Sequence, residues 1–224
     1  MPHRIFNFFL NLIFPQECLF CHKEMDRSYP LCRDCEKQIP LFSSWIVPPS
    51  TKYLSALGTA SSYKNAILRA TIHCFKYRKI ISLQYPLAGL LIKFIENNNY
   101  LLSFQQKDIY VIPIPLSKKK QRQRGFNQVD LIAQIISKHF HWNYIPDALQ
   151  RIKDNPPQAQ IEDTQRRKEN VKGIFQMNPL KQNLTEKIVI IVDDVYTSGA
   201  TMEEAARILK KTRVKKIIGL VLAQ

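Results

Sequence analysis

The sequence lacks the two glycine-rich motifs that bind phosphates in the most widespread nucleotide-binding folds. It has six glycines in 224 residues, and neither G-x-x-x-x-G-K-[ST] nor G-x-G-x-x-G occurs in it. These absences argue against a P-loop NTPase and against a dinucleotide-binding domain. Acidic residues are also few, with 18 Asp and Glu against 33 Lys and Arg, so the formal net charge is +15. A chain of this charge attracts polyanions of any kind.

No apolar run in the sequence is long enough to cross a bilayer. The run at residues 5–14 has ten residues, whereas a membrane-spanning helix needs about 20. No small-residue cleavage site follows this run, so it does not read as a signal peptide. We expect a short helix that packs on the rest of the protein, and membrane contact that is at most peripheral. The 45% hydrophobic content and the length suit one main domain plus a small appendage.

Two adjacent carboxylates precede a hydroxyl-rich turn in the stretch IVIIVDDVYTSGAT, residues 188–201. The unbroken apolar run at residues 188–192 predicts a central parallel strand that is covered on both faces. Residues 202–211 predict a helix, with acids in the first turn and cations near the end. The loop at residues 196–201 therefore joins the carboxyl end of a strand to the amino end of a helix. Ligands of open α/β sheets bind at this edge.

The polar groups of this stretch suit a sugar phosphate. Backbone N–H groups and hydroxyls at the helix terminus favour an anion, and Gly199 has no Cβ to keep a phosphate from the backbone. Carboxylates would repel the phosphate, but as pure acceptors Asp193 and Asp194 suit the vicinal hydroxyls of ribose, or a bridging Mg²⁺. The alternative is an ordinary capped turn whose acids are only solvated.

This stretch resembles the motif with which type I phosphoribosyltransferases bind 5-phosphoribosyl 1-diphosphate (PRPP). The resemblance implies that Asp193 and Asp194 hold the ribose hydroxyls. It also implies a turn that cradles the 5′-phosphate. Tyr196, where many members carry a smaller aliphatic residue, is a mild departure from the motif. The residues implied for the phosphate are Thr197, Ser198, Gly199, Ala200 and Thr201.

Four cysteines near the amino end form two C-x-x-C pairs, Cys18 with Cys21 and Cys32 with Cys35. Two such pairs can present four thiolates tetrahedrally, which closes a site around Zn²⁺ with no open position and predicts a structural metal. A pair of disulfides or an iron–sulfur cluster is the alternative. Thiolates held by zinc imply a reducing compartment, so we expect a cytoplasmic protein. Cys74 falls in an apolar helical pattern and is expected to be buried filler.

Apolar patterning predicts an α/β fold with a mostly parallel sheet flanked by helices. Strands are expected at residues 109–114, 174–177, 188–192 and 216–222. The segment at residues 42–54 contains Pro48, Pro49 and several serines and reads as a linker. The expected organisation is an amino-terminal helix and zinc module at 1–41, this linker, and a main domain at 55–224.

Two further polar segments are expected near the ligand. The first, residues 113–128, follows a predicted strand and is interpreted as a basic loop whose cations suit a diphosphate. The alternative is a solvated basic loop. The second, residues 153–172, is long and polar, and such loops are commonly lids or disordered. Phosphoribosyl transfer needs a lid that excludes water. The candidates for the diphosphate or the lid are Lys118, Lys119, Arg122, Arg124 and Arg167.

Together these features resemble the ComF family of bacterial natural competence, and ComFC-like proteins in particular. The resemblance is carried by the four cysteines, by IPIPLSKKKQRQRGFNQ, by RRKENVKGIF and by VDDVYTSGAT. It implies a phosphoribosyltransferase-like domain joined to a four-cysteine zinc module. It also implies a part in transformation, in which incoming single-stranded DNA enters the cytoplasm. Membership of a family specifies a fold more firmly than a reaction.

Two hypotheses of different class follow. In the favoured one the protein binds PRPP, with Mg²⁺, and grips single-stranded DNA through basic surfaces without reading its sequence. In the alternative it is an active phosphoribosyltransferase that passes ribose 5-phosphate to an unidentified acceptor. The chain ends almost where its last predicted strand does, which leaves few residues for a hood over an acceptor base. Either the zinc module supplies a substitute hood or no small base is recognised, and we favour binding. Other competence proteins, and the inner face of the cytoplasmic membrane, are further possible contacts.

Overall fold

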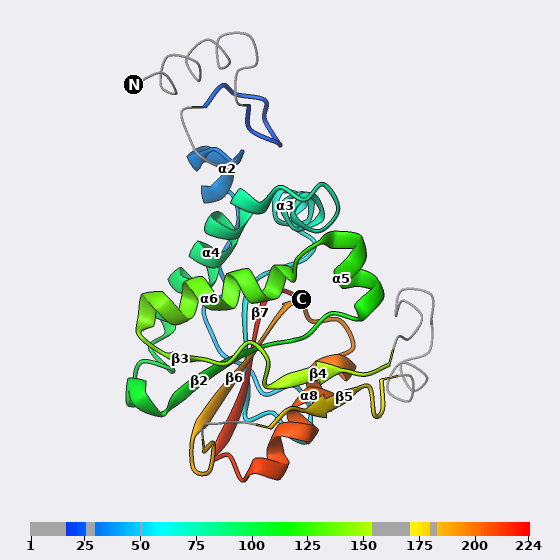
Figure 1. Cartoon of the computed structure of the whole chain (residues 1–224). Coiled ribbons are helices and arrows are strands. Elements are labelled where there is room, and N and C mark those ends of the chain that lie inside the picture. Colours follow the sequence, from blue (N-terminus) through cyan, green and yellow to red (C-terminus); the bar gives the residue numbers. More distant parts are fainter. Residues whose placement is uncertain (1–16, 26–29, 50, 154–170, 180–182) are drawn as a thin grey trace, which may run out of the picture.

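The centre of the molecule is a five-stranded parallel sheet with the strand order β1-β7-β6-β2-β3 (Figure 1). In this computed structural model the described residues are 17–25, 30–49, 51–153, 171–179 and 183–224. The expected parallel α/β sheet is therefore confirmed. The strands are β1 (Ala56–Ser61), β2 (Ile109–Pro113), β3 (Asn143–Tyr144), β6 (Ile188–Val195) and β7 (Lys216–Ala223).

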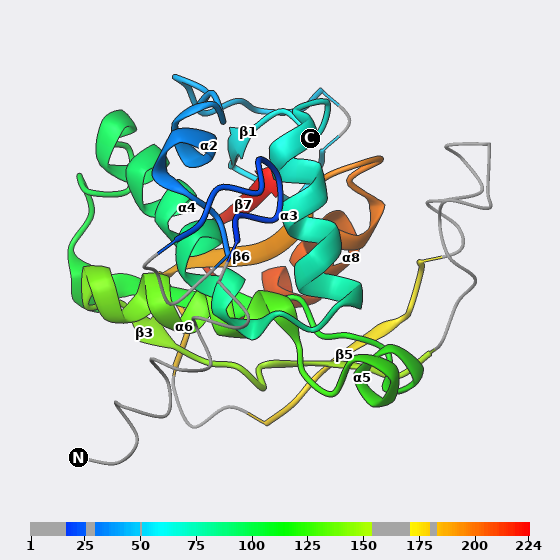
Figure 2. The ribbon, with the colours of Figure 1, turned by 90° about the horizontal axis from the view of Figure 1, so that it is seen from above.

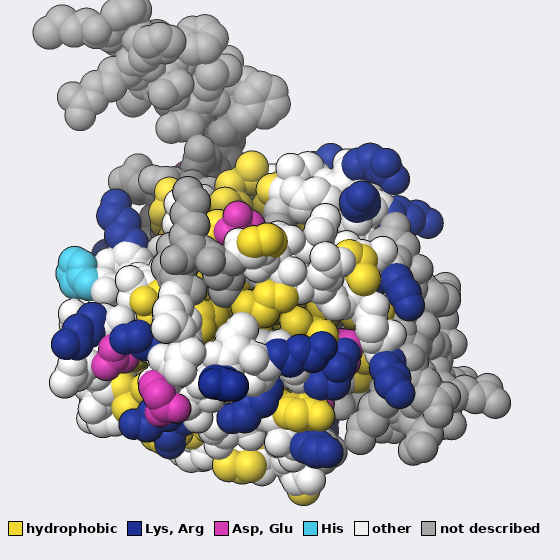
Figure 3. Space-filling view, turned by 60° about the horizontal axis from the view of Figure 1, so that its bottom comes forward, with side chains coloured by type: hydrophobic (Ala, Val, Ile, Leu, Met, Phe, Trp, Pro, Cys, Tyr) yellow, Lys and Arg dark blue, Asp and Glu magenta, His cyan; other side chains and the backbone are white. Residues whose placement is uncertain are grey.

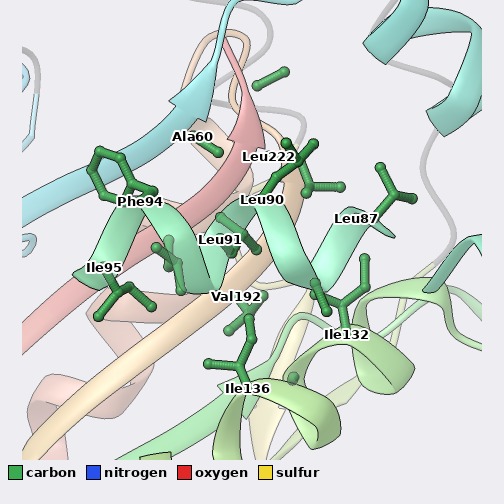
Figure 4. Close-up of a cluster of buried hydrophobic side chains, with 14 of the residues drawn as sticks. Ala60, Leu87, Leu90, Leu91, Phe94, Ile95, Ile132, Ile136, Val192 and Leu222 are labelled. Atoms are coloured by element: carbon green, nitrogen blue, oxygen red, sulfur yellow. The ribbon is translucent and has the colours of Figure 1, made fainter. Parts of the chain in front are cut away.

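Helices cover both faces of the sheet because its central strands are apolar on both sides. Alternate residues of β6 belong to different hydrophobic clusters, one on each face of the sheet. On one face, Ile190 packs with the helices α3 (Ala66–Tyr77), α4 (Gln84–Asn98) and α6 (Gln128–Phe140). Ile191 packs on the other side with α8 (Ala200–Leu209). Figure 4 shows α4 and α6 over the strands, with Leu91 of α4 and Ile136 of α6 near Val192 of β6. Figure 2 shows α3 above the ends of β6 and β7. Short 3-10 turns are η1 (Ile81–Leu83), η2 (Gln106–Asp108) and η4 (Lys210–Thr212).

The edge strand β1 is not among the strands that the sequence predicts. Its sequence, ALGTAS, contains two alanines and a glycine, which are depleted in strands, yet all six residues are buried. The small side chains make room for Trp45, because a Cβ on Gly58 would lie 2.4 Å from its ring. The segment predicted as a linker thus lies against the sheet, where Ile46 pairs antiparallel with Leu57.

The strand predicted at residues 174–177 belongs to a separate sheet. The structure has β5 (Phe175–Met177) paired antiparallel with β4 (Leu149–Arg151), outside the parallel sheet. A three-residue apolar pattern predicts an extended segment but not its partner. Only tertiary packing decides which strand it joins.

The basic segment that was predicted as a loop is partly a helix, α5 (Lys118–Arg124). The Ser117 hydroxyl caps its amino end by accepting a hydrogen bond from the Lys120 N–H at 3.3 Å. Unbranched Lys, Gln and Arg side chains favour a helix once a cap is present. The loop interpretation was wrong because charge and polarity were given more weight than these helix signals.

Some predictions fall on residues that the structure does not describe. These are the apolar run at 5–14 and almost all of the proposed lid, including Arg167. Within the described residues, no helix is both long and apolar enough to span a membrane.

Candidate functional site

The two carboxylates lie within β6, because the strand continues three residues beyond the predicted end, to Val195. Pairing with β7 holds this extension, with Asp193 opposite Val221 and Val195 opposite Ala223. Since side chains alternate along a strand, Asp193 and Asp194 point to opposite faces of the sheet. The pair therefore offers acceptors on both sides of the strand end.

Asp194 faces α3, where it forms an ion pair with Lys76. The Lys76 Nζ lies 2.7 Å from Asp194 Oδ1, and the two side chains are only 17% and 15% exposed. Low exposure strengthens the attraction, because little water screens it. The sequence analysis missed Lys76. It sits in a helix more than a hundred residues before the acids, and no local pattern links the two.

Asp193 faces the turn before α8, and its carboxyl group is harder to ionise. Burial, followed by the nearby charge of Asp194, raises the pKa of Asp193 to about 7. The Asp194 N–H donates to Asp193 Oδ1 at 2.8 Å and partly offsets this rise. A cation or a hydroxyl donor beside Asp193 would favour its charged form.

The turn after β6 places the start of α8 beside Asp193. The helix begins at Ala200, earlier than the predicted residue 202, and Gly199 provides no side-chain cap for its N–H groups. A small cavity of about 30 Å³ lies here, lined by Asp193 and by residues of the segment 195–202. Such a helix terminus suits an anion. The predicted residues Thr197, Ser198, Ala200 and Thr201 all belong to this turn or to the first turn of the helix.

The structure gives a further reason for a glycine at position 199, besides the expected approach of a phosphate. Its φ is +73°, a conformation that side chains disfavour. A Cβ at this position would lie 2.2 Å from the Tyr196 hydroxyl oxygen, so the Tyr196 ring fills the space beside Gly199. The aromatic residue that departs from the motif is therefore packed onto the turn itself.

The predicted diphosphate residues separate into two groups. Lys118, Lys119 and Arg122 are exposed on α5. Lys118 and Arg122 line a hollow of about 590 Å³, and neither Asp193 nor Asp194 is among its lining residues. Arg124 is buried and donates to the Gln128 side chain at 2.7 Å, with its guanidinium over the Tyr77 ring. The sequence did not indicate that these cations point in different directions, and their role toward a diphosphate stays a prediction.

Lys120 of α5, which the sequence analysis did not select, interacts electrostatically with Asp194. Burial lowers its pKa, as do the charges of Arg151, Arg124 and Lys76, while Asp194 opposes the decrease. Lys120 thus interacts with three other cations and with Asp194, which lies near the end of β6. The signal was available, because Lys120 and Arg124 are four residues apart and share a helix face.

The four cysteines of the amino-terminal region form one compact cluster. Their sulfur atoms all lie within 4.8 Å of one another, and none of the cysteines is in a disulfide. Cys21 Sγ and Cys32 Sγ are 3.6 Å apart, near the roughly 3.8 Å expected between sulfurs of a tetrahedral zinc site with Zn–S bonds of ~2.3 Å. The helix α2 (Arg33–Lys37) begins after Cys32 and carries Cys35. The cluster fits a structural zinc ion.

The pKa shifts of these cysteine thiols are also consistent with a bound metal ion. Burial acts to raise the pKa of Cys18, but hydrogen bonds from backbone N–H groups, including that of Cys32, outweigh it and lower the pKa to about 6. Burial and the neighbouring thiols raise the pKa of Cys35. Four thiolates in one cluster need a cation to neutralise them, and zinc binding releases their protons. Cys74, as predicted, is buried in α3 and lies outside the cluster.

Comparison with known families and proteins agrees with both parts of the molecule. A phosphoribosyl transferase domain model matches residues 131–224, and a double zinc ribbon domain model matches residues 9–45. The chain is 26% identical over 205 residues to Competence protein F of Haemophilus influenzae, covering 89% of this chain and 86% of that protein. It is 26% identical over 197 residues to the DNA utilization protein YhgH of Escherichia coli K12, covering 86% and 83%.

A third relative, Competence protein ComFC of Bacillus subtilis, is 29% identical over 185 residues, covering 81% of this chain and 66% of the relative. Among solved structures, a hypoxanthine phosphoribosyltransferase of Staphylococcus aureus is 13% identical, with a TM-score of 0.40 and coverage of 62% and 63%. That likeness is too distant to support an argument about function. From these relatives, its parallel sheet and its four-cysteine cluster, we conclude that the chain is a homologue of Competence protein F and ComFC that joins a phosphoribosyltransferase-like domain to a zinc module.

Proposed function

We propose that this protein binds PRPP at the end of β6 and acts in natural transformation. The observation that carries the proposal is the placement of two carboxylates beside a helix terminus whose N-cap residue, Gly199, has no side chain to cap it. Asp193 and Asp194 would accept hydrogen bonds from the ribose hydroxyls, and the N–H groups at residues 197–201 would hold the 5′-phosphate. Mg²⁺ would enter with PRPP, because it prefers carboxylate and phosphate oxygens.

The diphosphate of PRPP would lie on the cationic side of Asp194. Lys120 and Arg151 act electrostatically on one another there, beside Lys76. A guanidinium and an ammonium suit a diphosphate, since both donate charge-assisted hydrogen bonds. Lys118, Lys119 and Arg122 would then serve to attract the ligand from solution rather than to hold it.

A second basic surface, which we call the lower edge, supports the proposal of DNA binding. It consists of cations at the amino ends of the strands, and Figure 3 shows Lys and Arg gathered on this side. Asp193 and Asp194 lie at the sixth and seventh positions of β6, so the start of the strand at this edge lies roughly 17–20 Å from the acids. Its acids are Asp108, which pairs with Lys187 at 2.6 Å, and Glu186. The cations are Lys107, Lys187, Lys210, Lys211, Arg213, Lys215 and Lys216.

The lower edge fits a flexible polyanion better than a lipid surface. A hollow of about 440 Å³ lies there, lined by Lys211, Arg213 and polar side chains such as Asn183 and Thr185. These groups can donate hydrogen bonds to phosphates and bases. Three relatives are named for competence or DNA utilization. We therefore propose incoming single-stranded DNA as the partner, met in the cytoplasm with other competence proteins.

Charge reversal at the lower edge tests the DNA proposal. Lys211→Glu with Lys215→Glu is expected to weaken binding of a labelled single-stranded oligonucleotide at least tenfold at low salt, measured by fluorescence anisotropy. Each lost phosphate contact lowers the slope of log K against log[salt] by about 0.7. The matched control, Lys37→Glu with Lys64→Glu, makes the same charge change on exposed residues elsewhere. Equal losses in both double variants, or affinity that salt leaves unchanged, would refute a specific role for the lower edge.

An active phosphoribosyltransferase is the alternative function. The same site would support transfer if an acceptor reached C1 of the ribose while the cations stabilised the departing diphosphate. We expect no release of diphosphate from PRPP above the spontaneous rate in the absence of an acceptor. Diphosphate release assayed with each nucleobase and with single-stranded DNA separates the two functions. Release that depends on one of these acceptors, and that stops in Asp193→Asn, would establish the enzyme.

A further inference from the structure

The ion pair between Lys76 and Asp194 occupies an acceptor that the proposed sugar ligand requires. The ammonium nitrogen lies 2.7 Å from Oδ1, and both side chains are largely shielded from water. A ribose diol or a magnesium ion that uses Asp194 must therefore compete with an ammonium group that is already bound. Lys76 also acts electrostatically on Lys120 and on Asp193, so its charge affects both the cations and the acids of the site.

The surroundings of Lys76 determine what can replace Asp194 as its partner. Lys76, Arg124 and Arg151 all act on Lys120 as like charges. Asp194 acts on Lys120 as an opposite charge, and Lys76 and Lys120 in turn favour the charged form of Asp193. If Asp194 is taken by a ligand, the ammonium of Lys76 remains in a strongly positive, half-buried region. An anion of high charge density that enters together with the diol would compensate for this loss.

We propose that Lys76 is a specificity-determining residue that exchanges Asp194 for the 1-diphosphate of the incoming ligand. The inference rests on the proposed function of the site. A sugar carrying a diphosphate supplies a diol for Asp194 and an anion for Lys76 in the same step. Ribose 5-phosphate supplies only the diol, so its binding breaks the Lys76–Asp194 pair without replacing it. The ion pair thus makes the site selective for the diphosphorylated sugar.

Substitution of Lys76 tests the exchange through the ratio of two affinities. Calorimetric titrations with PRPP and with ribose 5-phosphate, both with Mg²⁺, are made on the wild type and on Lys76→Met. PRPP affinity is expected to fall at least tenfold in the variant, because the diphosphate loses its ammonium partner. Ribose 5-phosphate affinity is expected to stay the same or to rise, because the competing ammonium is gone. Preference for PRPP therefore falls at least tenfold.

Two further variants keep the test specific. Arg69→Met removes a cation from an exposed position on the same helix and should leave the preference unchanged. Lys76→Arg keeps the charge and should preserve most of the preference. If circular dichroism shows that the methionine variant is unfolded, Lys76→Gln is read in the same way.

The outcomes separate this inference from the function on which it rests. Equal weakening of both ligands by Lys76→Met would give Lys76 a merely structural role and overturn the exchange. An unchanged preference would overturn it too, while PRPP binding by the wild type would still support the site. A wild-type protein that binds neither ligand would overturn both proposals.

Discussion

Replacement of both Asp193 and Asp194 by asparagine is expected to reduce the affinity for PRPP by about a hundredfold or more. Each carboxylate that accepts from a ligand hydroxyl contributes roughly 1.5–3 kcal/mol, and 3 kcal/mol corresponds to more than a hundredfold in the dissociation constant. Asparagine has almost the same shape but carries no charge, so it binds Mg²⁺ and hydroxyl donors more weakly. Titration calorimetry with PRPP and Mg²⁺ measures this effect directly.

The double variant is expected to fold, and a matched control separates an effect at the site from an effect of removing any carboxylate. Asp147→Asn alters an exposed carboxylate outside the site and is expected to leave PRPP affinity unchanged. Circular dichroism and thermal unfolding verify that the double variant is folded, because Lys76 loses its charged partner in it. If the folded double variant bound PRPP as the wild type does, the acids would have no role in holding the ribose.

Loss of zinc is expected to have the second large effect, on the amino-terminal module. The purified protein should contain one zinc ion per chain, and chelation or Cys32→Ser should release it. Structural zinc contributes on the order of 10 kcal/mol to the folding of small zinc modules. Without it, the contacts of the module with the main domain, such as the 3.0 Å ion pair between Lys93 and Glu36, should weaken. Hydrogen exchange across residues 17–41 reports this loosening.

Cys74 provides the control for the zinc experiment. It is buried in α3 and is not part of the four-cysteine cluster, so Cys74→Ser should retain a full complement of zinc. Slow exchange of residues 17–41 should also persist in that variant. Zinc content well below one per chain in protein purified under reducing conditions would contradict a structural zinc site. So would slow exchange that persists after chelation.

The central strand and the cysteine cluster could be predicted from the sequence because short stretches of neighbouring residues determine both of them. The unbroken apolar run of β6 indicated a buried parallel strand, and both the strand and its parallel neighbours are present. The spacing of the cysteines indicated a closed cluster of four sulfurs, which the structure contains. In each case neighbouring residues carry enough information, because the period of the strand or the reach of a metal site is short.

Features that depend on distant residues could not be predicted. The strand β1 forms because Trp45 and Phe94 pack over Gly58, although its own sequence has little strand propensity. Lys76 reaches Asp194 only after α3 has docked above the end of β6. The inward direction of Lys120 follows from the start of α5 at Lys118. Sequence composition located the positive charge, but helix phase and tertiary packing decide which cations face the acids.

A crystal structure of the protein with PRPP and Mg²⁺ tests the central claim most directly. The account predicts that the 5′-phosphate lies on the N–H groups at residues 197–201, and that the ribose hydroxyls lie on Asp193 and Asp194. It also predicts that the Lys76 ammonium has moved from Asp194 to the diphosphate. Electron density for PRPP at another place on the protein, or a site that stays empty at saturating PRPP, would contradict it.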